Sequence, residues 1–295
     1  MIVAATNLSK RFARHDAVHA ASLSVPAGAA YALIGANGAG KTTTLKMLVN
    51  ILKPDSGEAQ ILGVDSRRLT YRDFQRIAFV SENHKLPEAL TVDEYFRYWR
   101  TFYPSWDRAL EQELRKQLHL PPERRLDKLS HGMRIKTMLA GVLAFRPAVL
   151  VLDEPLSGLD PLVRDEVLER LLRQADETTI LISSHELTEI ESFTTHVAYM
   201  EKGRIVFEEP IERLSARFRE VRVTLPRVSG VAREFPDTWL TAETAGQVVR
   251  FVDSAFVSDE DLAHKVAARF GRIEHLETTP LSLREISKAL LRAAR

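Results

Sequence analysis

Apolar and polar residues alternate at the start of the chain, and continuous apolar runs appear further along it. The alternation at 1–30, interrupted by turn signals, predicts short antiparallel strands. Apolar runs without alternation are typical of strands in a parallel sheet that is covered on both faces. The chain has such runs at 31–34, 149–152 and 179–183, and we expect a buried strand at each.

Apolar residues at helical spacing separate these runs. This spacing predicts helices at 43–52, 162–174 and 187–193. Strands and helices therefore alternate, which indicates an α/β core. A longer helical stretch, at about 88–146, interrupts the alternation and is expected to form an insert in that core. Its apolar residues at helical spacing are Val92, Tyr95, Phe96 and Trp99, followed by Leu110, Leu114 and Leu118.

The pattern changes again in the last part of the chain. Alternating strands are predicted around 221–225 and 249–251, helices at 259–270 and 281–291, and a short strand at 272–277. We therefore expect one domain at 1–215 and a small α+β domain at 216–295. Because the second domain shows no catalytic set of residues, we interpret it as a packing or regulatory domain.

The composition narrows the class of protein. Of the 295 residues, 45% are hydrophobic and 27% are charged, as in ordinary soluble globular proteins. The formal net charge of +1 argues against broad attraction to phosphate, so no nucleic acid partner is expected. The absence of cysteine excludes disulfides and thiolate catalysis. No apolar run approaches the roughly 18 residues that span a bilayer, and the start does not resemble a signal peptide.

A glycine-rich motif follows the first buried strand. Residues 35–42 read GANGAGKT, which fits the phosphate-binding pattern of a Gly, four free positions, Gly, Lys and Thr. Backbone N–H groups of such a loop curl around phosphate oxygens, and the following helix adds its positive end. Lys41 is expected to contact the β- and γ-phosphates, and Thr42 to ligate Mg²⁺. The predicted nucleotide-binding residues here are Gly35, Ala36, Asn37, Gly38, Ala39, Gly40, Lys41, Thr42 and Thr43.

Two carboxylates, Asp153 and Glu154, follow the buried strand at 149–152. Open α/β sheets bind their ligands at such strand ends. Asp153 is expected to hold the Mg²⁺ shell, and Glu154 to polarise the water that attacks the γ-phosphate. Together with the phosphate loop, these residues predict the binding and hydrolysis of ATP with Mg²⁺.

The order of the remaining motifs resembles the ATP-binding subunits of ABC transporters. Residues 129–133 read LSHGM where that family has LSGGQ, and they precede the carboxylate strand. Gly-Leu-Asp at 158–160 resembles the family's D-loop, and His185 matches its switch histidine. Phe12 stands where the family stacks an aromatic ring on adenine. The resemblance covers residues 1 to about 215.

This resemblance implies a P-loop NTPase fold of the ABC ATPase type, with an antiparallel β subdomain and a helical signature subdomain. It implies a catalytic set of Lys41, Glu154 and His185. Ser130 and Gly132 would meet the γ-phosphate held by an opposite protomer, and Asp160 would communicate across that dimer. A homodimer or heterodimer would then drive a separate transmembrane permease subunit, from a cytoplasmic position on the inner face of the cell membrane.

Some positions depart from the family pattern. Glu82 stands where the Q-loop has Gln; its oxygens can still ligate Mg²⁺, although its charge changes the electrostatics of the site. His131 and Met133 alter the signature contact. With the segment at 102–107, these departures resemble bacterial multidrug and antibiotic exporter ATPases, so export of a drug, antibiotic or other amphiphile is expected. Part of the aromatic set Tyr95, Phe96, Tyr98, Trp99, Phe102 and Trp106 would dock the permease, and most of it would be helical core.

Two other functions remain open at this point. One is a soluble ABC-type ATPase acting on a ribosome or DNA, which is disfavoured by the single phosphate loop and by the lack of a coiled coil or zinc site. The other is a nucleotide sensor that does not hydrolyse ATP, which Glu82 and LSHGM would suggest. The presence of Lys41, Asp153, Glu154 and His185 argues against the sensor.

Overall fold

The computed structural model describes residues 1–295 except 14, 83, 175–176, 186–189, 227–234 and 294–295. The described residues form two compact units. The first comprises residues up to 185 and 192–208, and the second begins at Glu209 and takes in Ile190 and Glu191. The domain boundary predicted between 215 and 216 falls inside the second unit, within helix α7 (Ile211–Arg217).

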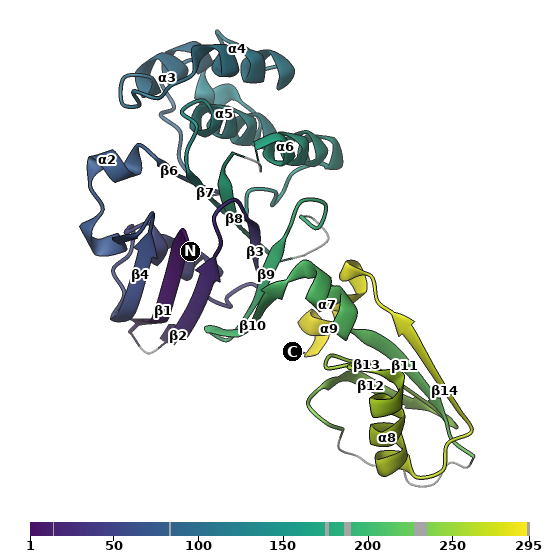
Figure 1. Ribbon diagram of the computed structural model, residues 1–295. Helices are drawn as coiled ribbons and strands as arrows, with labels where there is room; N and C mark the ends of the chain where they lie inside the picture. Colours follow the sequence, from purple (N-terminus) through teal and green to yellow (C-terminus); the bar gives the residue numbers. More distant parts are fainter. Residues whose placement is uncertain (14, 83, 175–176, 186–189, 227–234, 294–295) are drawn as a thin grey trace. The chain divides into compact units, whose positions relative to one another are not determined.

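The first unit contains an antiparallel sheet with the strand order β2-β1-β4-β5 (Figure 1). Its strands are β1 (Val3–Phe12), β2 (His15–Val25), β4 (Ser56–Ile61) and β5 (Val64–Asp65). Val3, Ala5 and Leu8 of β1 are buried, and a register shift between Ala5 and Leu8 moves the alternation by one residue. The apolar–polar alternation at 1–30 therefore produced the predicted antiparallel strands.

A second sheet of the first unit has the order β10-β9-β3-β8-β7-β6 and contains the strands that were predicted to be buried. They are β3 (Ala30–Ile34), β6 (Ile77–Ser81), β7 (Val149–Asp153), β8 (Thr179–Ser184), β9 (His196–Glu201) and β10 (Arg204–Pro210). β3 pairs in parallel with β8 and β9, and β7 pairs in parallel with β6 and β8. Every residue of β3, β7 and β8 is buried, as their continuous apolar sequences predicted.

Helix α1 (Lys41–Leu48) contacts β1, β2 and β4 of the antiparallel sheet and β7 of the second sheet. It ends before the predicted residue 52, because Asn50 adopts a φ of 57° that an α-helix cannot continue. The short helices η1 (Ser66–Arg68) and α2 (Tyr71–Phe74) follow β5. α6 (Pro161–Gln174) agrees with the helix predicted at 162–174.

The helical insert consists of α3 (Val92–Trp99), α4 (Arg108–Gln117), η2 (Leu126–Lys128) and α5 (His131–Leu143). A capping box starts α3: Thr91 Oγ1 accepts the N–H of Glu94, whose carboxylate accepts the N–H of Thr91. Glu111 of α4 is 1% exposed and accepts hydrogen bonds from Arg100 and Arg115. The apolar spacing at 92–118 therefore predicted this insert correctly.

The helix predicted at 187–193 is not a helix where it can be described. Of its range, residues 187–189 lie outside the described residues, and 190–193 form a turn.

The second unit is an α+β structure, as predicted. Beside α7, it contains β11 (Arg219–Thr224), β12 (Trp239–Ala245), β13 (Val248–Asp253), α8 (Asp259–Phe270), β14 (His275–Pro280) and α9 (Leu283–Ala293). The antiparallel sheet has the order β12-β13-β11-β14. In its core, Trp239 stacks on Phe251 with ring centroids 4.1 Å apart. Leu262 and Val266 of α8 belong to the same core.

Two strands of this unit differ from what the sequence predicted. The strand predicted at 272–277 lies at 275–280, because Gly271 caps the end of α8 and the chain must turn before His275 pairs with Thr224. β12 was not predicted: Thr241 adopts a φ of 51°, and the register shifts between Leu240 and Glu243. This irregularity breaks the period of two on which a strand prediction depends.

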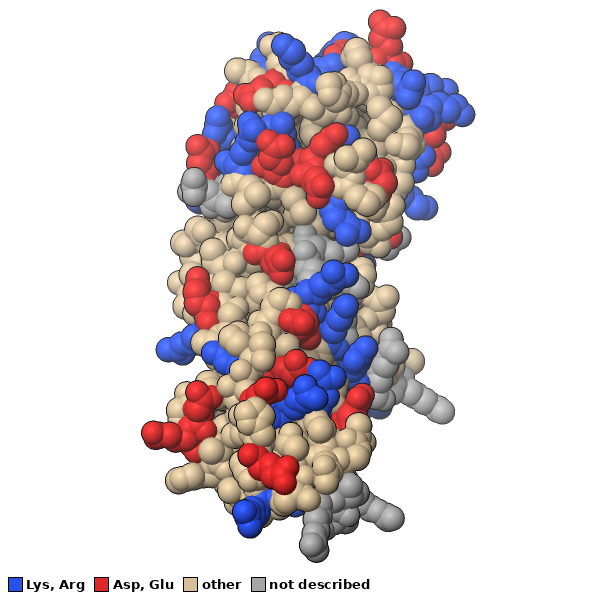
Figure 2. Space-filling view, turned by 90° about the vertical axis from the view of Figure 1, so that its right-hand side faces the viewer, with Lys and Arg blue, Asp and Glu red and all other residues tan. Residues whose placement is uncertain are grey.

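Among the described residues, no helix combines the length and apolar character needed to cross a membrane. On the face shown in Figure 2, acidic and basic side chains are interspersed, in agreement with the formal net charge of +1.

Candidate active site

Three parallel strands end side by side and place their polar residues together. In the register of β6, β7 and β8, Ser81 pairs with Asp153, and Asp153 pairs with Ser183. Asp153 Oδ1 accepts hydrogen bonds from Thr42 Oγ1 at 2.8 Å and Ser183 Oγ at 2.9 Å, and Oδ2 accepts one from Ser81 Oγ at 3.3 Å. The carboxylate is 3% exposed. Hydroxyl donors from both neighbouring strands and from α1 therefore hold it in place.

Gly38 and Gly40 of the phosphate loop between β3 and α1 favour glycine for different reasons. Gly38 has a φ of 82° with open space around it, so only its backbone conformation favours glycine. Gly40 has a φ of 105°, and a Cβ there would lie 2.4 Å from the carbonyl oxygen of Ala17. The loop therefore packs against β2 so closely that a side chain at 40 would collide with backbone.

The N-terminus of α1 opens onto this loop. Gly40, its N-cap residue, provides no side-chain hydrogen bond to the first turn. The first N–H groups of the helix therefore have no side-chain cap and, with the helix dipole, favour an anion at this end. Lys41 Nζ donates to the carbonyl oxygens of Gly35 at 2.7 Å and Ala36 at 3.3 Å. These bonds hold the ammonium group over the loop.

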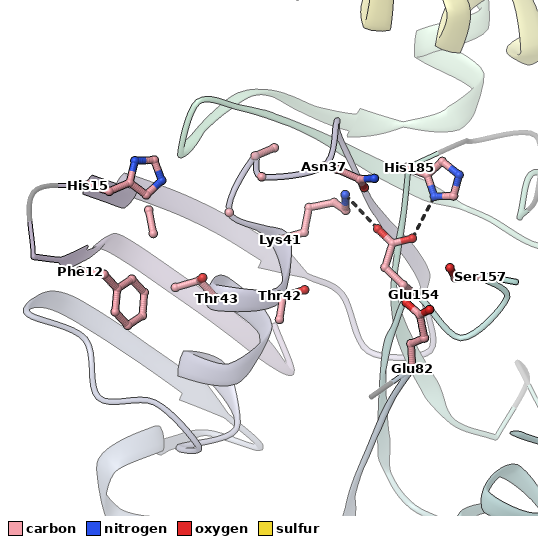
Figure 3. A pocket seen from close by; sticks show the side chains of 14 residues that line it. Phe12, His15, Asn37, Lys41, Thr42, Thr43, Glu82, Glu154, Ser157 and His185 are labelled. Carbon is pink, nitrogen blue, oxygen red and sulfur yellow. Dashed lines mark hydrogen bonds and ion pairs between the residues drawn. The ribbon is translucent and has the colours of Figure 1, made fainter. Parts of the chain in front are cut away.

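The carboxylate of Glu154 contacts both Lys41 and His185, the residue that follows β8. Its Oε1 lies 2.9 Å from Lys41 Nζ and its Oε2 lies 3.0 Å from His185 Nδ1, as Figure 3 shows with dashed lines. Glu154 also has a φ of 50°, and its N–H donates to Ser183 Oγ at 3.0 Å. Backbone in this region is strained for a residue with a Cβ, and such strain is often found at functional sites.

The surroundings of Glu154 keep its carboxylate ionised. Burial raises the pKa of Glu154, but hydrogen bonds from His185 and Lys41 outweigh that effect, so the pKa lies below its ordinary value of 4.5. Since Nδ1 of His185 faces a carboxylate, that nitrogen carries the proton in the hydrogen bond.

These residues line one cavity of about 530 Å³. The predicted residues that line it are Phe12, Asn37, Gly38, Ala39, Gly40, Lys41, Thr42, Thr43, Glu82, Glu154 and His185. Phe12 is 46% exposed, with Lys10 Nζ 5.7 Å from its ring centroid, so the exposed part of the ring can contact a planar ligand. Gly35, Ala36 and Asp153 do not line the cavity. Gly35 and Ala36 bind Lys41 through their carbonyl groups, and Asp153 lies beneath Thr42.

Three lining residues were missed in the sequence analysis: His15, Ala17 and Ser157. His15 is the cross-strand neighbour of Phe12 in the β1–β2 hairpin, and Figure 3 shows both at the same end of the pocket. The hairpin turn after Phe12 could have indicated His15, because a short turn pairs the residues on either side of it.

The predicted residues Ser130, Gly132 and Asp160 are not part of this cavity lining. Ser130 Oγ caps α5 by accepting the N–H of Met133 at 3.3 Å. Asp160 Oδ1 caps α6 by accepting the N–H of Val163 at 3.1 Å. Gly132 lies where α5 approaches Val163 of α6. The chain therefore holds these residues at helix starts, where they do not line its own pocket.

Comparison with known proteins places this chain among transport ATPases. The family model described as ABC transporter matches residues 18–157. The daunorubicin/doxorubicin resistance ATP-binding protein DrrA of Streptomyces peucetius is 31% identical over 281 residues, which are 92% of this chain and 85% of that protein. The bacitracin transport ATP-binding protein BcrA of Bacillus licheniformis is 32% identical over 223 residues, covering 74% of this chain and 73% of that protein.

The fold is also similar to that of a solved ABC transporter subunit. An ATP-binding subunit of an ABC transporter aligns with a TM-score of 0.67 at 26% identity, over 73% of this chain and 92% of that chain. The predicted ABC ATPase fold is thereby confirmed. The relatives are transporter proteins, which supports the transporter prediction over a role on ribosomes or DNA. The chain belongs to the ABC transporter family and is an ATP-binding, ATP-hydrolysing subunit of that family.

Proposed function

We propose that this chain powers a separate membrane permease that exports a drug, antibiotic or other amphiphile, with ATP hydrolysed at the Glu154 pocket. The observation that carries the chemistry is the linked set of Lys41, Glu154 and His185 in a cavity bordered by a phosphate loop. The printed functions of the relatives DrrA and BcrA, drug resistance and bacitracin transport, support the class of cargo.

Binding of the triphosphate would use the phosphate loop and Phe12. The uncapped N–H groups at the start of α1 and the ammonium of Lys41 favour phosphate oxygens. The ring of Phe12 lies at the other end of the cavity and offers a stacking surface for the adenine. Base, sugar and phosphates would thus lie in order between Phe12 and His185.

Hydrolysis would depend on Glu154. A phosphate that attracts Lys41 competes with the carboxylate for the same ammonium group and releases Oε1. The ionised Oε1 could then orient a water and accept its proton as that water attacks the γ-phosphate. ATP and water would become ADP and phosphate, while His185 holds Oε2 and contacts the γ-phosphate with its ring.

The residues at the base of the pocket fit a magnesium ion. Thr42 and Glu82 line the cavity, and Thr42 Oγ1 donates a hydrogen bond to Asp153 Oδ1 beneath it at 2.8 Å, so these three side chains offer only oxygen atoms. Magnesium prefers oxygen ligands and usually binds one or two carboxylates together with substrate phosphates. We propose Thr42, Asp153 and Glu82 as its ligands. The ion would neutralise the charge that develops on the phosphates.

A head-to-tail dimer would complete the site. Ser130 and Gly132 at the start of α5, and Asp160 at the start of α6, do not line this chain's own pocket. We propose that a second copy, or a related chain, receives them at its γ-phosphate. The positive end of α5 would then stabilise the phosphate from the opposite side.

An aromatic groove is the proposed docking surface for the permease. A cavity of about 620 Å³ between α2 and α3 is lined by Tyr71, Phe74, Gln75, Tyr98, Trp99, Thr101, Phe102 and Tyr103. Tyr98 and Phe102 are 53% and 50% exposed, whereas Tyr95 and Phe96 are buried in the core of the insert. Exposed apolar patches of this kind usually mark interaction sites. A cytoplasmic segment of the permease would fill the groove and hold the chain at the inner face of the membrane.

Size-exclusion chromatography of a Glu154→Gln variant tests this proposal. With Mg²⁺ and ATP the variant should elute as a dimer, because bound ATP is not cleaved, whereas with ADP it should elute as a monomer. Glu123→Gln, an exposed substitution in the helical insert, is the matched control and should behave like the parent. A variant that binds ATP yet remains monomeric would contradict the dimer. A parent that binds ATP without hydrolysing it would favour a nucleotide sensor.

A further inference from the structure

We propose that His131 is a positioning residue that couples this chain's own nucleotide pocket to the first turn of α5. The residue occupies the third position of LSHGM, where the related family has glycine. What the first turn of α5 does for a partner rests on the proposed function above. The coupling itself is a property of a single chain.

A hydrogen bond makes the connection. His131 Nε2 lies 3.1 Å from the carbonyl oxygen of Ser157. A carbonyl oxygen only accepts, so Nε2 carries the proton and donates it. This nitrogen remains a donor whether the ring is neutral in this tautomer or protonated. The ring also lies against Gly158, where a Cβ would be 3.8 Å from Nε2.

Ser157 belongs to the loop that begins at the proposed general base. It lines the nucleotide cavity, and its N–H donates to the carbonyl oxygen of Glu154 at 3.2 Å. Both ends of this short loop are held in the left-handed region, with φ values of 50° at Glu154 and 66° at Gly158. A turn bounded in this way is conformationally restricted. Movement of Glu154 on release from Lys41 is therefore expected to shift Ser157.

The first turn of α5 is also packed closely against α6, beside it in Figure 1. A Cβ at Gly132 would lie 3.1 Å from Val163 Cγ1, so the two helices approach more closely than a larger residue allows. One turn further along, Lys136 of α5 forms an ion pair with Glu166 of α6. The His131–Ser157 bond extends this contact to the pocket loop.

Packing does not explain why histidine stands at 131. Its side chain is exposed, and the helix start is already capped by Ser130. An alanine at this position would keep the helix but would remove the only side-chain donor that the described residues direct to the Ser157 carbonyl. We therefore assign the imidazole to the link between Ser157 and α5.

Hydrogen–deuterium exchange of the full chain tests this inference. The parent, His131→Ala and His131→Gln are compared with and without a non-hydrolysable ATP analogue and Mg²⁺, at a protein concentration where each is monomeric. Glutamine restores a donor of similar reach without a ring, so it is the matched control. Differences within each variant cancel the effect of the substitution on intrinsic exchange.

The parent and His131→Gln should show slower exchange at both 154–158 and 131–134 when the analogue binds. His131→Ala should show the change only at 154–158, with an affinity for the analogue within about twofold of the parent. A purely structural role would alter exchange without nucleotide and leave the response at 131–134 intact, which would overturn the inference. So would a His131→Gln variant that behaves like His131→Ala. A parent that binds no analogue would instead contradict the proposed function.

Discussion

Glu154 Oε1 and Lys41 Nζ lie 2.9 Å apart, with the two side chains 15% and 5% exposed. The residue proposed to activate water is thus paired with the residue proposed to hold the phosphates. Since both partners are largely removed from solvent, their attraction is stronger than that of a surface ion pair. The phosphates and the Glu154 carboxylate therefore compete for one ammonium group. Binding of ATP would in this way release the carboxylate for hydrolysis.

Substitution of Lys41 should weaken nucleotide binding. Lys41→Ala removes a charged hydrogen-bond donor that contributes about 1.5–3 kcal/mol to a phosphate contact, which corresponds to an affinity loss of about 10- to 100-fold. Titration with a fluorescent ATP analogue measures the change. Lys46→Ala, on the same helix but not among the residues that line the pocket, is the control and should retain the parent affinity. Equal affinities for the two variants would show that Lys41 does not hold the phosphates.

Acid should reduce the contribution of Glu154 to stability. Burial raises its pKa, but the bonds from His185 and Lys41 lower it further, to below the ordinary value of 4.5. A carboxylate with a lowered pKa in the folded state stabilises the protein above its unfolded pKa and loses that contribution as the pH falls through the folded pKa. Glu154→Gln should therefore cost about 1–3 kcal/mol near neutral pH, with a cost that shrinks below pH 4.5.

Thermal unfolding of the parent and Glu154→Gln across this pH range measures that difference. Other carboxylates also titrate there, so only the gap between the two curves reports on Glu154. A gap that stays constant, or widens in acid, would mean that Glu154 is not stabilised as an anion.

Alanine at two glycines of the phosphate loop should have unequal effects. Gly38→Ala places a Cβ in open space and should cost about 1–2 kcal/mol, because only its positive φ is strained. Gly40→Ala adds a collision with the carbonyl oxygen of Ala17 and should cost about 3–5 kcal/mol. Urea denaturation of both variants gives the two values. Equal losses of stability would contradict the close packing of the loop against β2.

Removal of two exposed rings from the aromatic groove should uncouple the chain from its permease. Tyr98→Ala with Phe102→Ala should weaken binding to the co-expressed membrane subunit by about 30-fold or more and so reduce co-purification, since aromatic anchors that become buried in an interface often contribute about 1–2 kcal/mol or more each. ATP hydrolysis by the isolated chain should remain at the parent level. Tyr71→Ala in the same groove should have an intermediate effect. Undiminished co-purification of the double variant would place the docking surface elsewhere.

The arrangement of the core follows closely from sequence patterns. Continuous apolar runs identified β3, β7 and β8, because strands that are buried on both faces consist mainly of apolar residues. Motif order then indicated that Lys41, Glu154 and His185 share a site, and the strand register brings them together. A single sequence carries this information because each signal is local to one strand end or loop.

Features that depend on contacts between distant segments were not accessible in this way. β12 was missed because its bulge at Thr241 removes the alternation. Ser81 and Ser183 were not recognised as partners of Asp153, since only the register of three strands brings their hydroxyl groups to it. The same applies to His131, whose partner Ser157 lies beyond another strand of the chain.

The steady-state rate of ATP hydrolysis by purified parent and Glu154→Gln proteins tests the central claim most directly. Loss of a positioned general base typically lowers kcat by about 10²- to 10⁴-fold, and the variant should retain parent-like ATP binding. We predict that combination for Glu154→Gln: ATP is bound but is no longer cleaved. A Glu154→Gln protein that hydrolyses ATP at the parent rate would contradict it.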